Sequence, residues 1–174
     1  MLIELDGQAP ELAADVYVAP TAVLIGRVRA AEGCSFWFHS VVRGDNEWLT
    51  FGEGTNLQDH CMCHADDGFP LTVGARCTIG HHAVLHGCTL EDDVLIGIGA
   101  RVLNGAVVER GALVAAGALV TEGARVQAGW LYMGAPARPV RELKPEELER
   151  MRFGAEHYRN NGARYRAGAR GLGR

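Results

Sequence analysis

The fold is decided by residues 90–126, LEDDVLIGIGARVLNGAVVERGALVAAGALVTEGARV, in which one pattern recurs every six residues. One position of each repeat holds a bulky aliphatic residue: Leu90, Ile96, Val102, Val108, Val114, Val120 and Val126. The residue four places further on is small and apolar, and from the second repeat onward it is alanine. A period of six fits neither an amphipathic helix nor a simple alternating strand. It is typical of a solenoid in which each face of a coil is one short strand and one turn.

The same spacing extends toward the N-terminus, with a break after Val42, a break at the loop ADDGFP (65–70) and one five-residue step after Leu85. The bulky positions, which we call rungs, are Val18, Leu24, Ala30, Phe36, Val42, Phe51, Leu57, Cys63, Val73, Ile79 and Leu85. Three faces of six residues make a triangular coil of eighteen, with rung stacked on rung and small residues at the corners. Glycine, Asn and Asp supply the tight turns. The sequence therefore predicts an all-β solenoid of parallel strands.

The bulk composition is that of a globular protein. The chain has 174 residues, of which 48% are hydrophobic and 22% charged, and this suits one domain with a real core. The formal net charge of −4 argues against nucleic acid as a partner. The N-terminal residues lack a signal peptide, and no apolar run is long enough to span a membrane, so we expect a cytoplasmic protein. Five cysteines, an odd number, favour reduced thiols over disulfides.

The repeat also divides the chain. We expect a lead-in or cap over 1–17, the solenoid over 18–128 and a connector over 129–143. Pro145, followed by two glutamates, suits the first turn of a helix, and apolar residues then recur at helical spacing. The sequence thus predicts an α-helix over 144–162, packed alongside the solenoid, and a flexible basic tail over 163–174.

The stretch HCMCH (60–64) looks like a metal site, but the six-residue repeat predicts which of its side chains point inward and which point outward. Cys61 falls on a small position and Cys63 on a rung, so both are predicted to point inward. Because side chains alternate along a strand, His60 and His64 then point outward. A Cys/His zinc knuckle is the alternative, and these opposite directions disfavour it. Two further cysteines, Cys34 and Cys77, also fall on inward small positions, and we interpret all four as buried small hydrophobes.

Three histidines share a meaningful spacing. His64 and His86 each follow a rung by one residue, so we expect them to lie one above the other on successive coils. His81 follows its rung by two and belongs to the preceding face, beyond a corner. One chain cannot easily bring all three imidazoles together, whereas two neighbouring chains can, which suggests a cyclic trimer with three equivalent sites. Three neutral imidazoles with an open fourth position are the ligand set of a catalytic metal that activates water.

Four stretches carry a closer resemblance: SFWFHSVVRGD (35–45), NLQDHCMCHADDGFPLTVG (56–74), GHHAVLHGC (80–88) and LYMGAPARPVREL (131–143). Together they resemble the γ-class carbonic anhydrase-like family over nearly the whole chain. The resemblance implies a left-handed parallel β-helix and a homotrimer with metal sites between subunits. It assigns the metal ligands to His64 and His86 of one chain and His81 of its neighbour. Zn²⁺ is the expected metal, and imidazole ligands also suit Fe²⁺ or Co²⁺.

The resemblance also assigns roles around the metal. Arg43 and Asp45 match an interface ion pair that orders the site, although a surface pair of little energetic value is the alternative. Gln58 matches the residue that hydrogen-bonds the water on the metal, and Asn56 and Asp59 match its companions.

Some positions are weaker candidates or depart from the family. Tyr132 is a candidate near the pocket, with plain packing as the alternative, and His60 and His82 have no family role. Well-studied relatives carry an acidic residue where this chain has Asn46, and a longer acidic loop where it has residues 65–70. Proton transfer to solvent then falls to other acidic residues, for which the candidates are Glu47, Asp66 and Asp67.

The function that the resemblance implies is reversible hydration of CO2 to bicarbonate by metal-activated water. An acyl-CoA thioesterase is an alternative, because the same water can attack a thioester. A non-catalytic metal-binding trimer is another. A hexapeptide acyltransferase fits less well, because such enzymes use a lone catalytic histidine and need no set of three.

Overall fold

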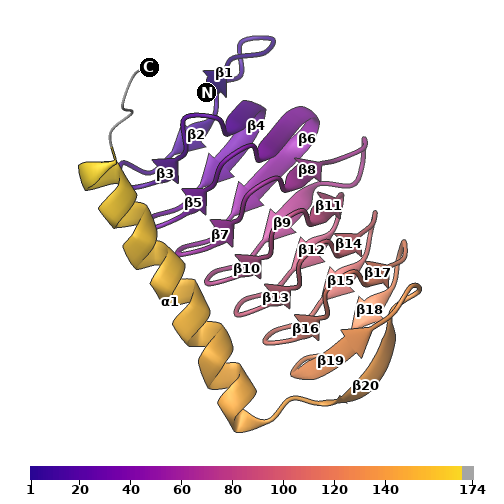
Figure 1. Ribbon diagram of the computed structural model, residues 1–174. Coiled ribbons are helices and arrows are strands. Elements are labelled where there is room, and N and C mark those ends of the chain that lie inside the picture. The colour runs from indigo at the N-terminus through magenta and orange to yellow at the C-terminus, as the bar shows by residue number, and fades with distance from the viewer. Residues whose placement is uncertain (170–174) are drawn as a thin grey trace.

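The structure is a computed structural model that describes residues 1–169, so residues 170–174 of the expected tail lie outside the described part. The chain winds into a stack of triangular coils with a helix running alongside (Figure 1). Strands one coil apart pair in parallel, as in Leu95 with Leu113 and Arg101 with Leu119. These partners are eighteen residues apart, so the coil length predicted from the repeat is confirmed.

Two faces of the prism belong to one twelve-stranded sheet, because β6 (Val41–Phe51) pairs with β8 through its first residues and with β9 through its last. The first face continues through β8 (Met62–His64), β11 (Val84–His86), β14 (Arg101–Val102) and β17 (Leu119–Val120). The second continues through β9 (Leu71–Val73), β12 (Thr89–Leu90), β15 (Val107–Val108) and β18 (Arg125–Val126). Beside β6 lies β4 (Val23–Ala30), which pairs with β1 (Leu2–Ile3) and β2 (Glu11–Leu12).

The third face is an eight-stranded sheet. Its parallel strands are β3 (Tyr17–Val18), β5 (Ser35–Phe36), β7 (Asn56–Leu57), β10 (Thr78–Ile79), β13 (Leu95–Ile96), β16 (Leu113–Val114) and β19 (Trp130–Met133). The antiparallel strand β20 (Arg138–Glu142) closes it. The expected lead-in and connector therefore extend the sheets rather than lying outside them, since unpaired end strands would leave their backbone groups without partners.

The rungs form the core. Every rung from Leu24 to Val126 is at most 5% exposed, whereas Val18 at the open end is only partly buried. All five cysteines are free and buried, which confirms the inward direction predicted for Cys61 and Cys63. Thiols of Cys34, Cys61 and Cys77 donate to backbone carbonyls 3.0–3.1 Å away on the next coil. Burial raises the pKa of these three thiols and of Cys88 to about 12.

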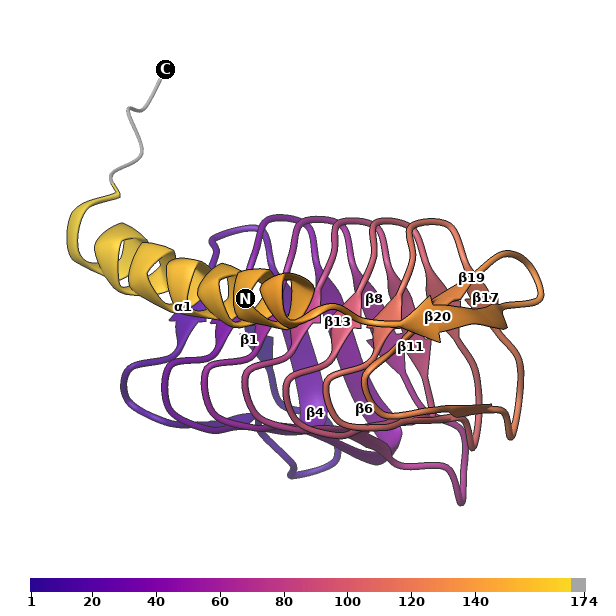
Figure 2. The ribbon, with the colours of Figure 1, turned by 90° about the horizontal axis from the view of Figure 1, so that it is seen from below.

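Helix α1 (Pro145–Gly168) lies along the third face and contacts β3, β5, β7 and β10 (Figures 1 and 2). It ends six residues later than predicted, so residues 163–168 are helical rather than part of a tail. The reason is tertiary contact: the ring of Tyr165 lies 5.0 Å from that of Trp37 and 5.8 Å from that of Tyr17. Within residues 1–169, no helix is long and apolar enough to cross a membrane.

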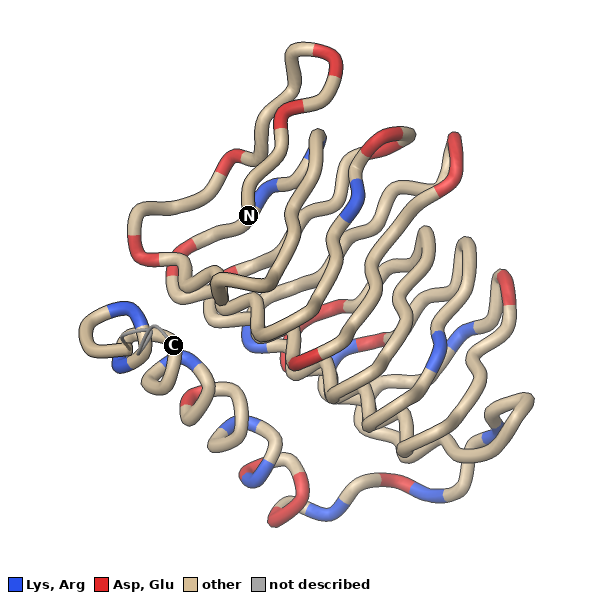
Figure 3. The backbone as a smooth tube through the Cα atoms, turned by 45° about the horizontal axis from the view of Figure 1, so that its top comes forward, with Lys and Arg blue, Asp and Glu red and all other residues tan. Residues whose placement is uncertain are grey.

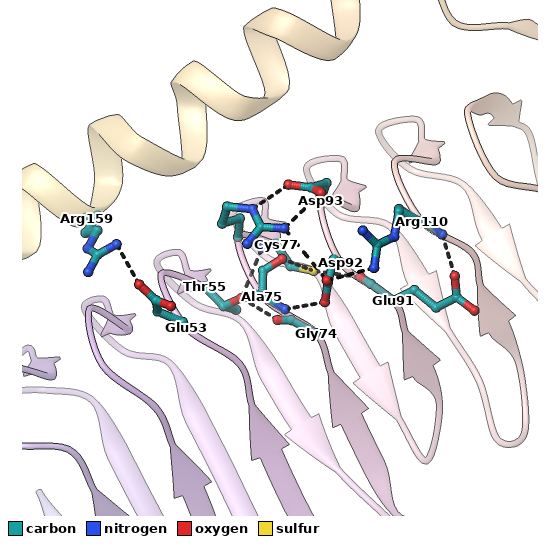
Figure 4. A network of polar contacts seen from close by, with 11 residues as sticks. Glu53, Thr55, Gly74, Ala75, Cys77, Glu91, Asp92, Asp93, Arg110 and Arg159 are labelled. Atoms are coloured by element: carbon teal, nitrogen blue, oxygen red, sulfur yellow. Dashed lines mark hydrogen bonds and ion pairs between the residues drawn. The ribbon is translucent and has the colours of Figure 1, made fainter.

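Many charged residues lie on α1 and at the turns of the coils (Figure 3). Beneath α1, a row of ion pairs follows one corner of the prism: Arg159 with Glu53, Arg76 with Asp93 and Arg110 with Asp92, at 2.7–3.0 Å (Figure 4). Most of these side chains are well exposed, so each pair contributes little energy. Of the three, the Arg159–Glu53 pair joins α1 to the corner, and the other two join neighbouring coils.

Candidate metal centre

His64 and His86 end neighbouring strands of the first face. His64 closes β8, His86 closes β11, and the two residues are direct register partners. Their preceding rungs, Cys63 and Leu85, fill the core, so the alternation of the strand turns both imidazoles outward. The Nδ1 atom of His64 lies 3.0 Å from the Nε2 atom of His86. The stacking predicted from the repeat phase is therefore confirmed.

Asp45 holds the outer nitrogen of His64. One oxygen of its carboxylate lies 2.8 Å from His64 Nε2, and the other pairs with the guanidinium of Arg43. Burial raises the pKa of the Asp45 carboxyl, but hydrogen bonds from His64 and Arg43 outweigh burial and hold that pKa below its ordinary value. The group is therefore an ionised acceptor at neutral pH, so a neutral His64 ring, the form that binds a metal, carries its hydrogen on Nε2 and presents a lone pair at Nδ1.

Asn104 holds the outer nitrogen of His86 in the same way. Its Oδ1 lies 2.8 Å from His86 Nδ1, while its amide nitrogen donates to Asp66 Oδ2 at 2.8 Å. Because a carboxylate only accepts, Asn104 must turn its nitrogen to Asp66 and its oxygen to His86. His86 Nδ1 therefore carries the hydrogen, and Nε2 presents a lone pair toward His64.

Two lone pairs that face each other across 3.0 Å suit a shared cation. Two nitrogens on one tetrahedral Zn²⁺, each about 2.0–2.1 Å from the metal, are themselves about 3.3 Å apart. The two histidines thus fit a metal such as zinc. Asp66 lies beside them, and the ligand atoms of His64, Asp66 and His86 all lie within 4.8 Å of one another.

His81 does not join this cluster in the described chain. It lies in the turn between β10 and β11, half-exposed, with Nδ1 3.0 Å from Asp59 Oδ2. The other oxygen of Asp59 accepts the backbone N–H of Phe38 at 3.2 Å. Asp59 therefore anchors His81 as Asp45 anchors His64, and leaves the second ring nitrogen of His81 available as a donor to a metal.

Gln58 and Asn56 lie on or beside β7, on the third face. The amide nitrogen of Gln58 donates to Asn56 Oδ1 at 3.2 Å, and the amide nitrogen of Asn56 donates to Thr78 Oγ1 at 3.0 Å. Both residues are buried, and the hydrogen bonds of their side chains go to one another, to Thr78 and to the carbonyl of Cys77 rather than to His64 or His86. Tyr132 pairs with Val114 in the last coil and belongs to the core cluster, the arrangement expected of a packing residue.

His60 and His82, which have no family role, form a separate feature together with His39. His39, His60 and His82 occupy one corner with positive φ values of 59–61°, and their rings stack at 5.0 and 4.7 Å. Sequence reasoning missed the role of Asn104 beside His86. The signal was present, because Asn104 follows His86 by eighteen residues, the length of one coil.

The fold and the two facing histidines define the class of protein: a hexapeptide-repeat, left-handed parallel β-helix with a candidate metal site on one corner. Solved structures agree. A putative acetyltransferase of Bacillus cereus superposes with a TM-score of 0.95 at 33% identity, covering 96% of this chain and 97% of that one. A hexapeptide transferase family protein from Anaplasma phagocytophilum gives a TM-score of 0.92 at 35% identity, covering 95% and 98%. No protein-family model matches the chain.

Curated relatives give the family. The probable carbonic anhydrase of Methanocaldococcus jannaschii is 44% identical over 144 residues, which are 83% of this chain and 91% of that protein. The carbonic anhydrase of Geobacillus kaustophilus is 37% identical over 96% of this chain and 92% of that protein. The chain belongs to the γ carbonic anhydrase family, as the four sequence stretches predicted.

The plant members of the family are longer. Mitochondrial γ carbonic anhydrase 2 of Arabidopsis thaliana is 40% identical over 91% of this chain, and the match covers only 59% of the plant protein. The expected cytoplasmic location of this chain stays a prediction.

Proposed function

We propose that the protein is a metal-dependent γ-type carbonic anhydrase that interconverts CO2 and bicarbonate. The observation that carries the proposal is the pair of lone-pair nitrogens on His64 and His86, each fixed by a hydrogen bond to the opposite side of its ring. The names of the curated relatives support the same reaction. Zn²⁺ is the proposed metal, with Fe²⁺ or Co²⁺ as alternatives that imidazole ligands also accept.

The third ligand in this proposal is His81 of the partner subunit. Three features support it: His81 lies on another corner, its Nδ1 is committed to Asp59, and it is half-exposed on the free chain. A contact in which each subunit offers His64 and His86 to one neighbour and His81 to the other closes by rotation into a homotrimer with three sites. Asp66 of the same chain is the competing third ligand, since its Oδ1 lies 3.9 Å from His86 Nε2.

His64 and His86, with a third ligand, would hold a metal, and the chemistry it would supply when bound is a coordinated water with a pKa of about 7, a nucleophile for CO2 at neutral pH. The chain's own residues provide orientation. Asp45 and Asn104 hold the rings, and Arg43 holds Asp45. Gln58 precedes Asp59, which holds His81, so Gln58 reaches the reacting water only in a site that His81 of the partner subunit completes; its amide nitrogen is committed to Asn56, which leaves its oxygen as the acceptor.

Hydration also releases a proton, which must reach the solvent. Asn46 cannot take it, and its amide instead donates to the carbonyl of Ala65 at 3.1 Å, where it holds the 65–70 loop. Asp66 lies in that loop, close to His86 and half-exposed, so it is the proposed carrier between site and buffer.

Acyl-CoA chemistry is the second candidate, because both solved structures above are described as transferases. A thioester carbonyl is a target for the same activated water. Two assays on one sample distinguish the candidates. The sample is anaerobically purified protein whose metal content has been quantified. CO2 hydration is measured by stopped flow with and without imidazole, and release of free CoA is measured with acyl-CoA as the substrate. CO2 hydration that increases with imidazole supports a carbonic anhydrase limited by proton transfer. A full metal site with neither activity assigns the protein a binding role.

A further inference from the structure

We propose that Asn104 is a positioning residue that fixes the protonation of the His86 ring, so that Nε2 is the nitrogen offered to the metal. This inference rests on the proposed function. The geometry that carries it is a chain of three groups, in which Asp66 orients the amide of Asn104 and that amide orients His86. Because His86 Nδ1 is held as a donor, the ring has one free lone pair, and it faces His64.

The backbone around Asn104 makes room for this contact. A Cβ on Gly87 would lie only 2.2 Å from Asn104 Oδ1 and 2.8 Å from Phe69 Cβ. Gly87 directly follows His86 and has a φ of +55°, so any other residue would push the Asn104 amide away from the ring. The glycine therefore allows Asn104 to cross beneath it and reach His86.

The turn that contains Asn104 does not itself require asparagine. Asn104–Gly105 stands one coil before Glu122–Gly123, and the two glycines have nearly equal φ values of 67° and 64°. The backbone N–H of Gly123 donates to the carbonyl of Asn104 at 2.9 Å, a contact independent of the side chain. The equivalent turn one coil further on is therefore formed with glutamate in this position. The turn does not require the amide of Asn104, whereas the hydrogen bond to His86 does.

The test compares Asn104→Leu, which keeps the size but removes the acceptor, with the double variant Asp66→Asn/Asn104→Asp, which keeps the acceptor for His86 and lets residue 66 donate to residue 104; Asp66→Asn alone is its reference. Glu122→Ala is the matched control in the equivalent turn. The first readout is Zn²⁺ affinity by competition with a chelator. The second is the protonation of the His86 ring nitrogens, by ¹⁵N NMR of the metal-free and metal-loaded protein.

Asn104→Leu is expected to weaken Zn²⁺ binding by about 10- to 100-fold, with the hydrogen no longer confined to His86 Nδ1. The Asp66→Asn/Asn104→Asp double variant is expected to bind Zn²⁺ within a few-fold of Asp66→Asn alone. Glu122→Ala should match wild type in both readouts. The inference is overturned if Asn104→Leu binds Zn²⁺ like wild type, or if the Asp66→Asn/Asn104→Asp double variant binds Zn²⁺ as weakly as Asn104→Leu while Asp66→Asn alone binds it like wild type.

The outcome is separable from that of the proposed function. A wild-type protein that binds Zn²⁺ through His86 but does not hydrate CO2 defeats the proposed reaction and leaves the role of Asn104 standing. A wild-type His86 with its hydrogen on Nε2 in the metal-free protein defeats the role of Asn104, whatever the activity.

Discussion

His64 and His86 face each other across 3.0 Å, each through the ring nitrogen that its hydrogen-bond partners leave without a hydrogen. The repeat brings the two rings together, because they occupy the same phase of adjacent coils. The partners Asp45 and Asn104 then determine what the pair can bind. Two fixed lone pairs at this separation supply two ligands of a metal site. A complete site also needs a third ligand, and it depends on the groups that orient the two rings.

The third ligand is tested by two single substitutions. If His81 of the partner subunit completes the site, His81→Ala should abolish stoichiometric metal in every site, whereas Asp66→Asn should retain it. The reason is that three nitrogen ligands bind Zn²⁺ far better than two. Metal content of the purified variants, measured by plasma emission spectrometry, checks this. Full metal in His81→Ala together with loss in Asp66→Asn would assign the site to a single chain.

Asp45→Asn should weaken metal binding by about 10- to 100-fold while leaving the fold intact. An amide has no charge to fix the hydrogen on His64 Nε2, and it also loses the ion pair with Arg43. Chelator competition measures the affinity. The control is Glu11→Gln, which removes an exposed carboxylate paired with Arg29 and should leave metal affinity unchanged. Equal affinity for the Asp45 variant and the control would remove Asp45 from the site.

The cysteines should be inert in the folded protein. All five are buried, and burial raises the pKa of Cys34, Cys61, Cys77 and Cys88 to about 12, so almost no thiolate exists at pH 8. A colorimetric thiol reagent should therefore detect no reactive cysteine in native protein and all five in denaturant. Rapid reaction of a native thiol would contradict the inward placement that separates the cysteines of HCMCH from its histidines.

The stability that Glu147 contributes at the start of α1 should be lost in acid. Hydrogen bonds from Arg141 and from the backbone of Lys144 lower the pKa of Glu147 from its ordinary 4.5 to about 2. A depressed folded pKa gives stability that is fully present above about pH 4.5 and is lost as pH falls toward 2. Urea unfolding should therefore show Glu147→Gln less stable than wild type at pH 7, with the difference shrinking below pH 4.5. A difference independent of pH would contradict this.

The solenoid could be predicted from the sequence because its signal is local and repeated. Each rung, such as Ile96 or Val114, points into the core. The faces, the coil length and the stacking of His64 on His86 therefore all follow from the six-residue repeat. The length of α1 could not be predicted, since its last turns are held by Tyr165 against aromatic residues far away in sequence.

The surroundings of the histidines were only partly predictable. Asp45 and Asp59 came from the resemblance to a family, and their contacts with His64 and His81 depend on side-chain directions at corners. Asn104 was missed because asparagine before glycine is the ordinary composition of a turn. Only the eighteen-residue distance to His86 distinguishes it from the other turns.

The most direct test of a site shared between copies is complementation of two inactive variants. A His81→Ala chain keeps His64 and His86, and a chain with His64→Ala and His86→Ala keeps His81. Each variant alone should lack metal and CO2 hydration, but random mixing in co-expressed trimers should rebuild about one quarter of the sites. Metal content and CO2 hydration that return together to about that fraction are the predicted result, whereas mixed trimers that remain free of metal would contradict the shared site.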